Sequence, residues 1–161
     1  MEAKEKQDEL IELLGVHFEK YYNLSPLASR IKSYLIVNNK EEGVTFDELV
    51  HELSASKSSV STNLNVLLSM ETIFYCTKKG DRKKYFKISP FSLRLKKYMD
   101  NINDEMFIIE KLENFKEENC AKEKDKLVLH NIKMYKEHMA QMKKLLQVTM
   151  DKLIEVENKT N

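Results

Sequence analysis

The stretch that decides the fold runs from residue 45 to residue 88 and reads TFDELVHELSASKSSVSTNLNVLLSMETIFYCTKKGDRKKYFKI. Residues 45–48 have capping-box spacing, in which the Thr45 hydroxyl accepts from the Glu48 N–H and Glu48 reaches back. A short helix is expected to follow and to end at the small residues 54–56. Ser56 is then a suitable N-cap for a second helix that continues to Met70. Two short helices joined by a tight turn form a helix-turn-helix motif.

The sequence after these two helices changes from helical to strand-like periodicity. Residues 73–77 and 85–88 are rich in aromatic and β-branched side chains, and they flank a polar segment that contains Gly80. This pattern predicts a β-hairpin. A hairpin that directly follows a helix-turn-helix is a wing, and the order of the three pieces is more specific than any one of them. We therefore predict a winged helix-turn-helix domain over residues 25–90.

Helical patterns are expected on both sides of this domain. Apolar residues recur at helical spacing from residue 7 to residue 22, and Ser25-Pro26 provides an N-cap and a first-turn proline for a helix that ends near Asn38. Ser89-Pro90 is expected to begin a further helix in the same way, ending near Asn119. The fold class is thus mainly α with one small β-hairpin. We expect residues 1–24 to support packing or dimerisation and residues 91–161 to form a helical dimerisation region.

The C-terminal region carries a regular apolar seam whose members alternate steps of four and three from Val128 to Val156, interrupted by Thr149. A period of 3.5 residues is what helices need when they pack at a shallow angle. Packing against helices of the same chain is one interpretation. We favour dimerisation, because the helix is long and follows a small domain. The predicted dimerisation residues are Val128, Ile132, Tyr135, Met139, Met142, Leu146 and Leu153.

The composition excludes several classes of protein. The chain has 161 residues, of which 42% are hydrophobic, and no stretch approaches the roughly 18 apolar residues of a membrane helix. Three glycines rule out glycine-rich phosphate loops. The two cysteines, Cys76 and Cys120, make neither a disulfide framework nor a zinc site. We expect a cytoplasmic protein that is not an enzyme and that needs no cofactor and no metal ion.

Charge is distributed very unevenly along the chain. Residues 1–53 carry six basic and eleven acidic side chains (net −5). Residues 54–98 carry ten basic and two acidic side chains (net +8), and residues 99–161 carry eleven basic and thirteen acidic side chains (net −2). A basic middle between acidic flanks is typical of a surface that meets an anion such as nucleic acid. A solvated lysine-rich surface is the alternative.

The second helix of the motif has an unusual polar face. Its apolar side contains Val60, Leu64 and Leu67, whereas the other side presents small hydroxyls and an amide. Such side chains suit close approach to base edges and phosphates, and an ordinary exposed helix would instead favour Glu and Lys. A serine-rich surface helix is the alternative. The predicted DNA-contacting residues of this helix are Ser56, Lys57, Ser58, Ser59, Ser61, Thr62 and Asn65.

The hairpin tip concentrates positive charge, which would release counterions on contact with DNA. Arg82 is positioned to enter a narrow minor groove, and Asp81 is expected to hold the turn or to orient Arg82. The predicted DNA-contacting residues of the wing are Lys78, Lys79, Gly80, Asp81, Arg82, Lys83 and Lys84.

Several stretches together resemble MarR-type winged-helix transcription regulators, and in particular their GbsR-like branch. They are TFDELV from residue 45, ASKSSVSTNL from residue 55 and GDRKKYF from residue 80, with LGVHFE from residue 14 and LSPLASRI from residue 24. The resemblance covers about residues 8–90. It implies a homodimer that straddles a near-palindromic operator, and two-fold symmetry places the half-sites about one helical turn apart.

Some members of that family sense small molecules, and the resemblance implies an effector pocket at His17, Phe18, Tyr21, Tyr22 and Tyr34. An aromatic cluster can bind a quaternary ammonium such as choline by cation–π attraction. Aromatic residues at helical spacing are also typical core residues, which is the other interpretation.

The predicted function is that of a homodimeric, sequence-specific DNA-binding regulator, a repressor that blocks a promoter and is released by a small-molecule effector. The alternative is a winged-helix adaptor that binds another protein and does not read DNA sequence. The predicted partners are double-stranded DNA and a second copy of the chain.

Overall fold

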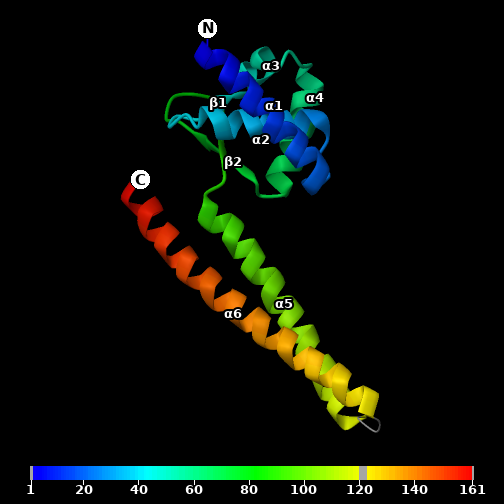
Figure 1. Cartoon of the computed structure of the whole chain (residues 1–161). Helices are drawn as coiled ribbons and strands as arrows, with labels where there is room; N and C mark the ends of the chain where they lie inside the picture. The colour runs from blue at the N-terminus through cyan, green and yellow to red at the C-terminus, as the bar shows by residue number, and fades with distance from the viewer. Residues whose placement is uncertain (1, 120–122, 161) are drawn as a thin grey trace. The chain divides into compact units, whose positions relative to one another are not determined.

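The computed structural model describes residues 2–119 and 123–160, so Cys120 lies outside the described residues. The chain divides into two compact units, residues 1–89 and residues 90–161. The first unit contains α1 (Glu2–Tyr22), α2 (Pro26–Asn38), β1 (Val44–Thr45), α3 (Phe46–Glu52), α4 (Lys57–Ser69), β2 (Ile73–Thr77) and β3 (Lys84–Ile88) (Figure 1). The predicted mainly α fold is confirmed, and the predicted two-stranded hairpin is part of a larger sheet.

The sheet has three antiparallel strands in the order β1-β3-β2. The register pairs Ile73 with Ile88 and Thr77 with Lys84 in the hairpin, and it pairs Val44 with Phe86 at the other edge of β3. Gly43 precedes β1 with a φ of +83°, and a Cβ atom there would lie 3.0 Å from the Tyr85 Cβ atom. A side chain at position 43 would therefore strain the backbone and push β1 away from β3.

The sequence analysis missed β1 because two residues are too short to show the alternation that identifies a strand.

Helix caps account for the boundaries of the short helices. The Thr45 hydroxyl accepts from the Glu48 N–H at 3.3 Å, and the Glu48 carboxylate accepts from the Thr45 N–H at 2.8 Å, which confirms the capping box. Ser25 and Ser56 cap α2 and α4 as predicted. The turn between α3 and α4 has no glycine, and Ser54 adopts the left-handed conformation there with a φ of +48°.

Two helix starts differ from the prediction. The first helix begins at Glu2 rather than at residue 7. Ser89 does not cap α5, because its hydroxyl donates to the Glu71 carbonyl at 2.7 Å and its N–H donates to the Thr72 carbonyl at 3.0 Å. Ser89 thus ties the end of β3 to the segment between α4 and β2, and Pro90 is the residue before the first helical turn.

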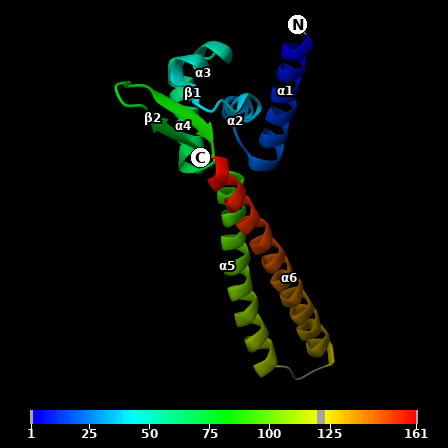
Figure 2. The same cartoon turned by 90° about the vertical axis from the view of Figure 1, so that its left-hand side faces the viewer.

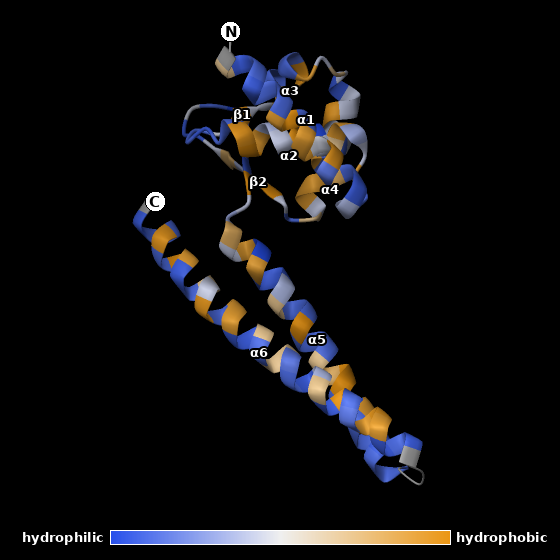
Figure 3. Cartoon of the chain, in the orientation of Figure 1, coloured by the Kyte–Doolittle hydropathy of each residue, from blue (hydrophilic) through white to orange (hydrophobic). Residues whose placement is uncertain are grey.

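The second unit consists of α5 (Phe91–Glu118) and α6 (Glu123–Thr160), which pack side by side along their lengths (Figure 2). Their contact buries Ile102, Ile109 and Met139, with Ile132 and Leu146 packed around them. Apolar residues recur at intervals along both helices, as the repeated orange segments in Figure 3 show. None of the described helices has an apolar run long enough to cross a membrane.

The capping box at α3 makes the stability of the first unit depend on pH. The Lys40 ammonium, 2.8 Å from the Glu48 carboxylate, and the Thr45 N–H lower the pKa of Glu48 from 4.5 to about 2. A carboxyl group whose pKa is lower in the folded state stabilises the fold above the unfolded-state pKa, and this contribution is lost as the pH falls from about 4.5 towards about 2.

We predict that Glu48→Gln lowers the free energy of unfolding at pH 7 by no more than about 1 kcal/mol, because solvent partly screens the carboxylate. The difference from the wild type should shrink between pH 4.5 and pH 2. Urea unfolding at several pH values measures both effects, with Glu41→Gln in the neighbouring loop as the control. A difference that is the same at pH 7 and pH 2 would contradict this account of the capping box.

Candidate nucleic-acid interface

The orientation of α4 is fixed by its apolar side. Val60, Leu64 and Leu67 are 0–3% exposed in the core of the first unit. The seven predicted DNA-contacting residues of this helix and its cap are all exposed. Burial of one side of α4 therefore turns its hydroxyl and amide side chains outwards as one surface.

Several hydroxyls at the start of α4 already have partners within the helix. The Ser56 hydroxyl lies 2.8 Å from the Ser59 hydroxyl and 3.1 Å from the Ser58 hydroxyl, and Thr62 donates to the Ser58 carbonyl at 3.0 Å. Ser61 and Asn65 lie further along the helix and line a hollow beside it. At the N-terminal end of α4 the exposed hydroxyls are thus hydrogen-bonded within the helix, whereas Ser61 and Asn65 further along face the hollow.

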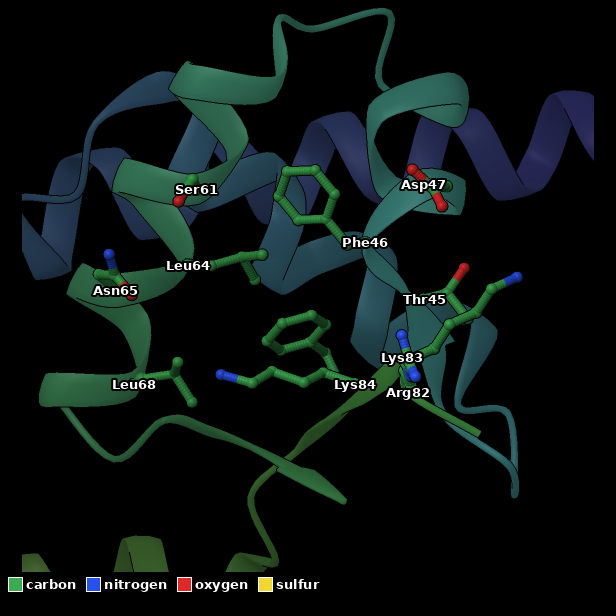
Figure 4. A pocket seen from close by; sticks show the side chains of 11 residues that line it. Thr45, Phe46, Asp47, Ser61, Leu64, Asn65, Leu68, Arg82, Lys83 and Lys84 are labelled. Carbon is green, nitrogen blue, oxygen red and sulfur yellow. The ribbon is translucent and has the colours of Figure 1, made fainter. Parts of the chain in front are cut away.

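This hollow, of about 350 Å³, brings α4, the start of α3 and the wing together (Figure 4). Ser61 and Asn65 lie on the α4 side, and Arg82, Lys83 and Lys84 lie on the wing side. The apolar residues Phe46, Leu64, Leu68 and Phe86 complete the lining with Thr45 and Asp47. The two elements that the sequence analysis selected separately, the polar helix face and the basic hairpin, therefore border the same concave surface.

Asp81 holds the turn at the wing tip, which confirms one of its two predicted roles. Its carboxylate accepts from the Lys83 N–H at 2.9 Å and from the Tyr85 hydroxyl at 2.6 Å. These hydrogen bonds lower the pKa of Asp81 and raise the pKa of Tyr85. Gly80, with a φ of +82°, supplies the left-handed residue that the turn requires.

Two of the predicted contact lysines have partners within the first unit. The Lys78 ammonium is 2.7 Å from the Glu42 carboxylate and 4.3 Å from the centre of the Tyr85 ring. The Lys84 ammonium lies 4.2 Å from the centre of the Tyr75 ring. Lys78 thus ties the wing to the loop before β1. All five basic side chains from Lys78 to Lys84 remain exposed.

The sequence analysis missed Phe46, Thr45 and Asp47 as neighbours of the candidate interface. Phe46, the first residue of α3, lies in the lining of the hollow. A further missed contact joins α2 to α4, where the Ser25 hydroxyl donates to the Asn63 side-chain oxygen. Such contacts join segments far apart in the sequence, so no local pattern indicates them.

The five residues of the predicted effector pocket do not line one pocket in the structure. The rings of His17, Phe18, Tyr21 and Tyr22 form one cluster, with centroid distances of 4.9–6.0 Å. Tyr34 lines a different hollow with Asp8, Ile11, Glu12, Arg30, Glu52 and Leu53.

The aromatic cluster already contains a cation of the protein. The Lys32 ammonium lies 4.0 Å from the Phe18 ring centre and 4.6 Å from the Tyr22 ring centre, and Lys32 is only 2% exposed. A ligand cation between these two rings would have to displace the Lys32 ammonium.

The residues of the predicted dimerisation seam fall into two groups, one packed against α5 and one exposed. Ile132, Met139 and Leu146 pack against α5 of the same chain. By contrast, Val128, Tyr135 and Met142 are 37%, 44% and 43% exposed. Leu153, the seventh predicted residue, is half-buried. Packing within the chain, which the sequence analysis considered and did not favour, therefore accounts for three of the seven predicted residues.

The chain is similar in sequence to a known transcriptional regulator over about half of its length. No family model matches the chain. The HTH-type transcriptional regulator MmpR5 of Mycobacterium tuberculosis is 34% identical over 82 residues, which are 51% of this chain and 48% of MmpR5. The match therefore spans about half of the length of that relative.

Two solved structures are similar to the chain. A crystal structure of a transcriptional regulator superposes with a TM-score of 0.65 at 21% identity, covering 93% of this chain and 99% of that one. A structure of the S. aureus MepR–DNA complex gives a TM-score of 0.43 at 17% identity, covering 70% of this chain and 90% of that one. The element order, the strand register and the first of these structures define the fold as that of winged-helix transcription regulators.

The hydrogen bonds of Asp81 give a test of the wing-tip geometry. We predict that Asp81→Ala brings the pKa of Tyr85 back towards its ordinary value near 10 and speeds hydrogen exchange at the Lys83 amide, because both protons lose their acceptor. NMR titration and amide exchange measure these changes. Asp81→Asn keeps an acceptor oxygen and should preserve the protection of the amide. Unchanged exchange in Asp81→Ala would contradict the role of Asp81 in holding the turn.

Proposed function

We propose that the protein is a sequence-specific, DNA-binding transcription regulator of the MarR type, from the GbsR-like branch. One observation carries the proposal: the uncharged polar side of α4 and the basic wing tip border the same hollow (Figure 4). Small hydroxyls and an amide suit base edges, and a cluster of cations suits the phosphate backbone. The similarity of half of the chain to MmpR5, a transcriptional regulator, supports the same function.

In the proposed complex α4 enters the major groove of duplex DNA. Ser61 and Asn65 approach base edges, since they lie beyond the hydrogen-bonded start of the helix and face the hollow. Arg82 and Lys83 at the wing tip contact phosphates or an adjacent minor groove, where negative potential attracts arginine. Asp81 presents these cations in a fixed turn, which reduces the entropy lost on binding.

The protein acts in this proposal as a homodimer in the cytoplasm. Two copies place two α4 helices and two wings on the half-sites of a near-palindromic operator, about one helical turn apart. Occupation of a promoter then represses transcription by steric occlusion, with no chemical step. Release by a small-molecule effector belongs to the same proposal, and operator affinity measured across a panel of metabolites tests it.

The two kinds of contact predict different effects of substitution. Asn65→Ala should weaken binding to a specific fragment by about 1–3 kcal/mol and should barely change binding to unrelated DNA, because Asn65 reads bases. Arg82→Ala should weaken binding to all DNA. It should also reduce the slope of log affinity against log salt concentration by about one, the amount expected when one phosphate contact is lost. Fluorescence anisotropy over a salt series measures both effects.

Lys144→Ala provides the matched control, because Lys144 is an exposed cation of α6 and belongs to neither α4 nor the wing. Its affinity for DNA should equal that of the wild type. If Asn65→Ala and Arg82→Ala also bind as the wild type does, α4 and the wing do not contact DNA. The adaptor interpretation would then replace the proposed function.

A further inference from the structure

The hollow that contains Tyr34 has a volume of about 340 Å³ and lies between α1, α2 and the end of α3. All three helices belong to the first unit, and neither α4 nor the wing contributes to the lining. We name it the α1–α3 hollow. Its lining residues are Asp8, Ile11 and Glu12 from α1, Arg30 and Tyr34 from α2, and Glu52 and Leu53 from the end of α3.

Side-chain contacts between α1 and α2 hold this hollow open. The Gln7 side-chain amide donates to the Asn38 side-chain oxygen at 2.9 Å. The Arg30 guanidinium donates to both oxygens of the Glu12 carboxylate, at 2.7 and 2.8 Å. The hollow is therefore formed in the free protein, and a ligand that enters it need not rearrange the helices before it binds.

Tyr34 is the residue that points to a ligand. It is only 9% exposed, yet its hydroxyl makes no hydrogen bond within the described residues. In the same part of the chain the one fully buried side-chain polar atom without a partner belongs to Ser29, so the Tyr34 hydroxyl still reaches the hollow that its side chain lines. A polar group that is almost buried is ordinarily hydrogen-bonded, because it has lost its contacts with water. The Tyr34 hydroxyl thus offers an open hydrogen-bonding position to a molecule in the hollow.

The surroundings of Tyr34 keep this hydroxyl protonated. Burial raises the pKa of Tyr34, and the charge of the Glu52 carboxylate raises it further. Glu52 lines the same hollow, so its carboxylate and the Tyr34 hydroxyl are available to the same ligand.

The other charges around the hollow favour a cation. Arg30 and Glu12 neutralise each other in their ion pair. Glu52 lies beside a ring nitrogen of His51 at 3.2 Å. Neither Glu52 nor Asp8 has a lysine or arginine partner in the part of the chain that the structure describes. Two carboxylates therefore remain available to a positively charged ligand.

The lining fits an organic cation better than a metal ion. Among the described residues, no group of three Asp, Glu, His or Cys side chains is arranged to hold a metal ion. The hollow also has apolar walls, formed by Ile11 and Leu53, which methylene groups can cover. Carboxylates and a hydroxyl oxygen accept hydrogen bonds from N–H groups.

We propose that the α1–α3 hollow binds a small aliphatic cation that carries an ammonium or guanidinium group. Its N–H groups donate to the Asp8 and Glu52 carboxylates and to the Tyr34 hydroxyl. Its methylene groups pack against Ile11 and Leu53. A bound cation would thus bridge α1 and the end of α3.

This site differs from the effector pocket that the sequence predicted. Of the five residues of that pocket only Tyr34 lines the α1–α3 hollow, and the other four form the cluster around Lys32. The ligand also differs, because a quaternary ammonium has no N–H group to donate. The inference goes beyond the proposed function, since binding in this hollow does not require that the protein reads DNA.

Isothermal titration calorimetry of the full chain at neutral pH and low salt tests the proposal, with the linear diamine putrescine as the probe. We expect saturable binding of one putrescine per chain with a dissociation constant of about 1 mM or lower. Choline is the comparison ligand, and its dissociation constant should be at least about 10-fold higher, because it cannot replace the hydrogen bonds of an ammonium group.

Substitutions in the lining should weaken the binding of putrescine. Tyr34→Phe and Glu52→Gln should each raise its dissociation constant by about fivefold or more, because each removes an acceptor for the ammonium group. Glu9→Gln is the matched control, since it removes one negative charge from an exposed position of α1 that does not line the hollow. Its dissociation constant should stay within about twofold of the wild-type value, because exposed charges interact weakly over a distance.

A second measurement separates a binding role of Tyr34 from a structural one. In the absence of putrescine, Tyr34→Phe should unfold at the same temperature as the wild type or at a higher one, because the lost hydroxyl has no hydrogen bond in the free protein. A lower unfolding temperature would show that the fold needs this hydroxyl, and it would overturn the assignment of the hydroxyl to a ligand.

Each contrary result of the titrations overturns the proposal. Absence of saturable heat up to about 10 mM putrescine would exclude the site. Equal weakening by Glu9→Gln, or unchanged binding in Tyr34→Phe and Glu52→Gln, would reduce the effect to a general attraction of cations to an acidic surface. Choline binding as tight as that of putrescine would contradict the hydrogen bonds. None of these results bears on Asn65→Ala and Arg82→Ala, which test the reading of DNA.

Discussion

The candidate DNA-binding surface depends on the burial of one side of α4. Val60, Leu64 and Leu67 lose nearly all of their exposed surface to the core of the first unit. Burial of each such side chain contributes about 1.5–3 kcal/mol, so a rotation of α4 that exposed them would be strongly unfavourable. The hydroxyl and amide side chains on the opposite side are thereby fixed as the outward surface. A helix that lacked this apolar stripe would present no defined polar face.

The wing is held in place by a separate set of constraints. The close approach at Gly43 allows β1 to pair with β3, the ion pair of Glu42 with Lys78 ties the loop before β1 to the hairpin, and Asp81 closes the tip. These contacts bring the basic tip and the polar side of α4 to the same hollow. The candidate interface is therefore formed by residues of the first unit alone.

Local chemistry explains which features the sequence could predict. The capping box at Thr45, the caps at Ser25 and Ser56 and the hairpin around Gly80 involve residues close together in the chain, and the structure confirms all of them. The two-residue strand β1 was missed because it is identified by its pairing with β3. Val44 pairs with Phe86, which lies 42 residues further along the chain, and no local sequence pattern covers that separation. The aromatic cluster was predicted from α1, but its occupation by Lys32 depends on how α2 packs against α1.

The seam on α6 shows a second limit of periodicity. A 3.5-residue repeat identifies a helix that packs against helices, but it does not say how many neighbours share the stripe. Here one half of the stripe, with Met139 at its centre, faces α5, and the other half, with Met142, is exposed.

The central claim is that α4 and the wing read a specific DNA sequence, and selection from the protein's own genomic DNA tests it most directly. Fragments of that DNA would be bound to the purified chain at increasing salt, recovered and sequenced. The account predicts that a few fragments survive at high salt and share an inverted repeat whose half-sites lie about one helical turn apart. Recovery of all fragments in proportion to their length, with binding lost at modest salt, would contradict it and would leave only a basic surface.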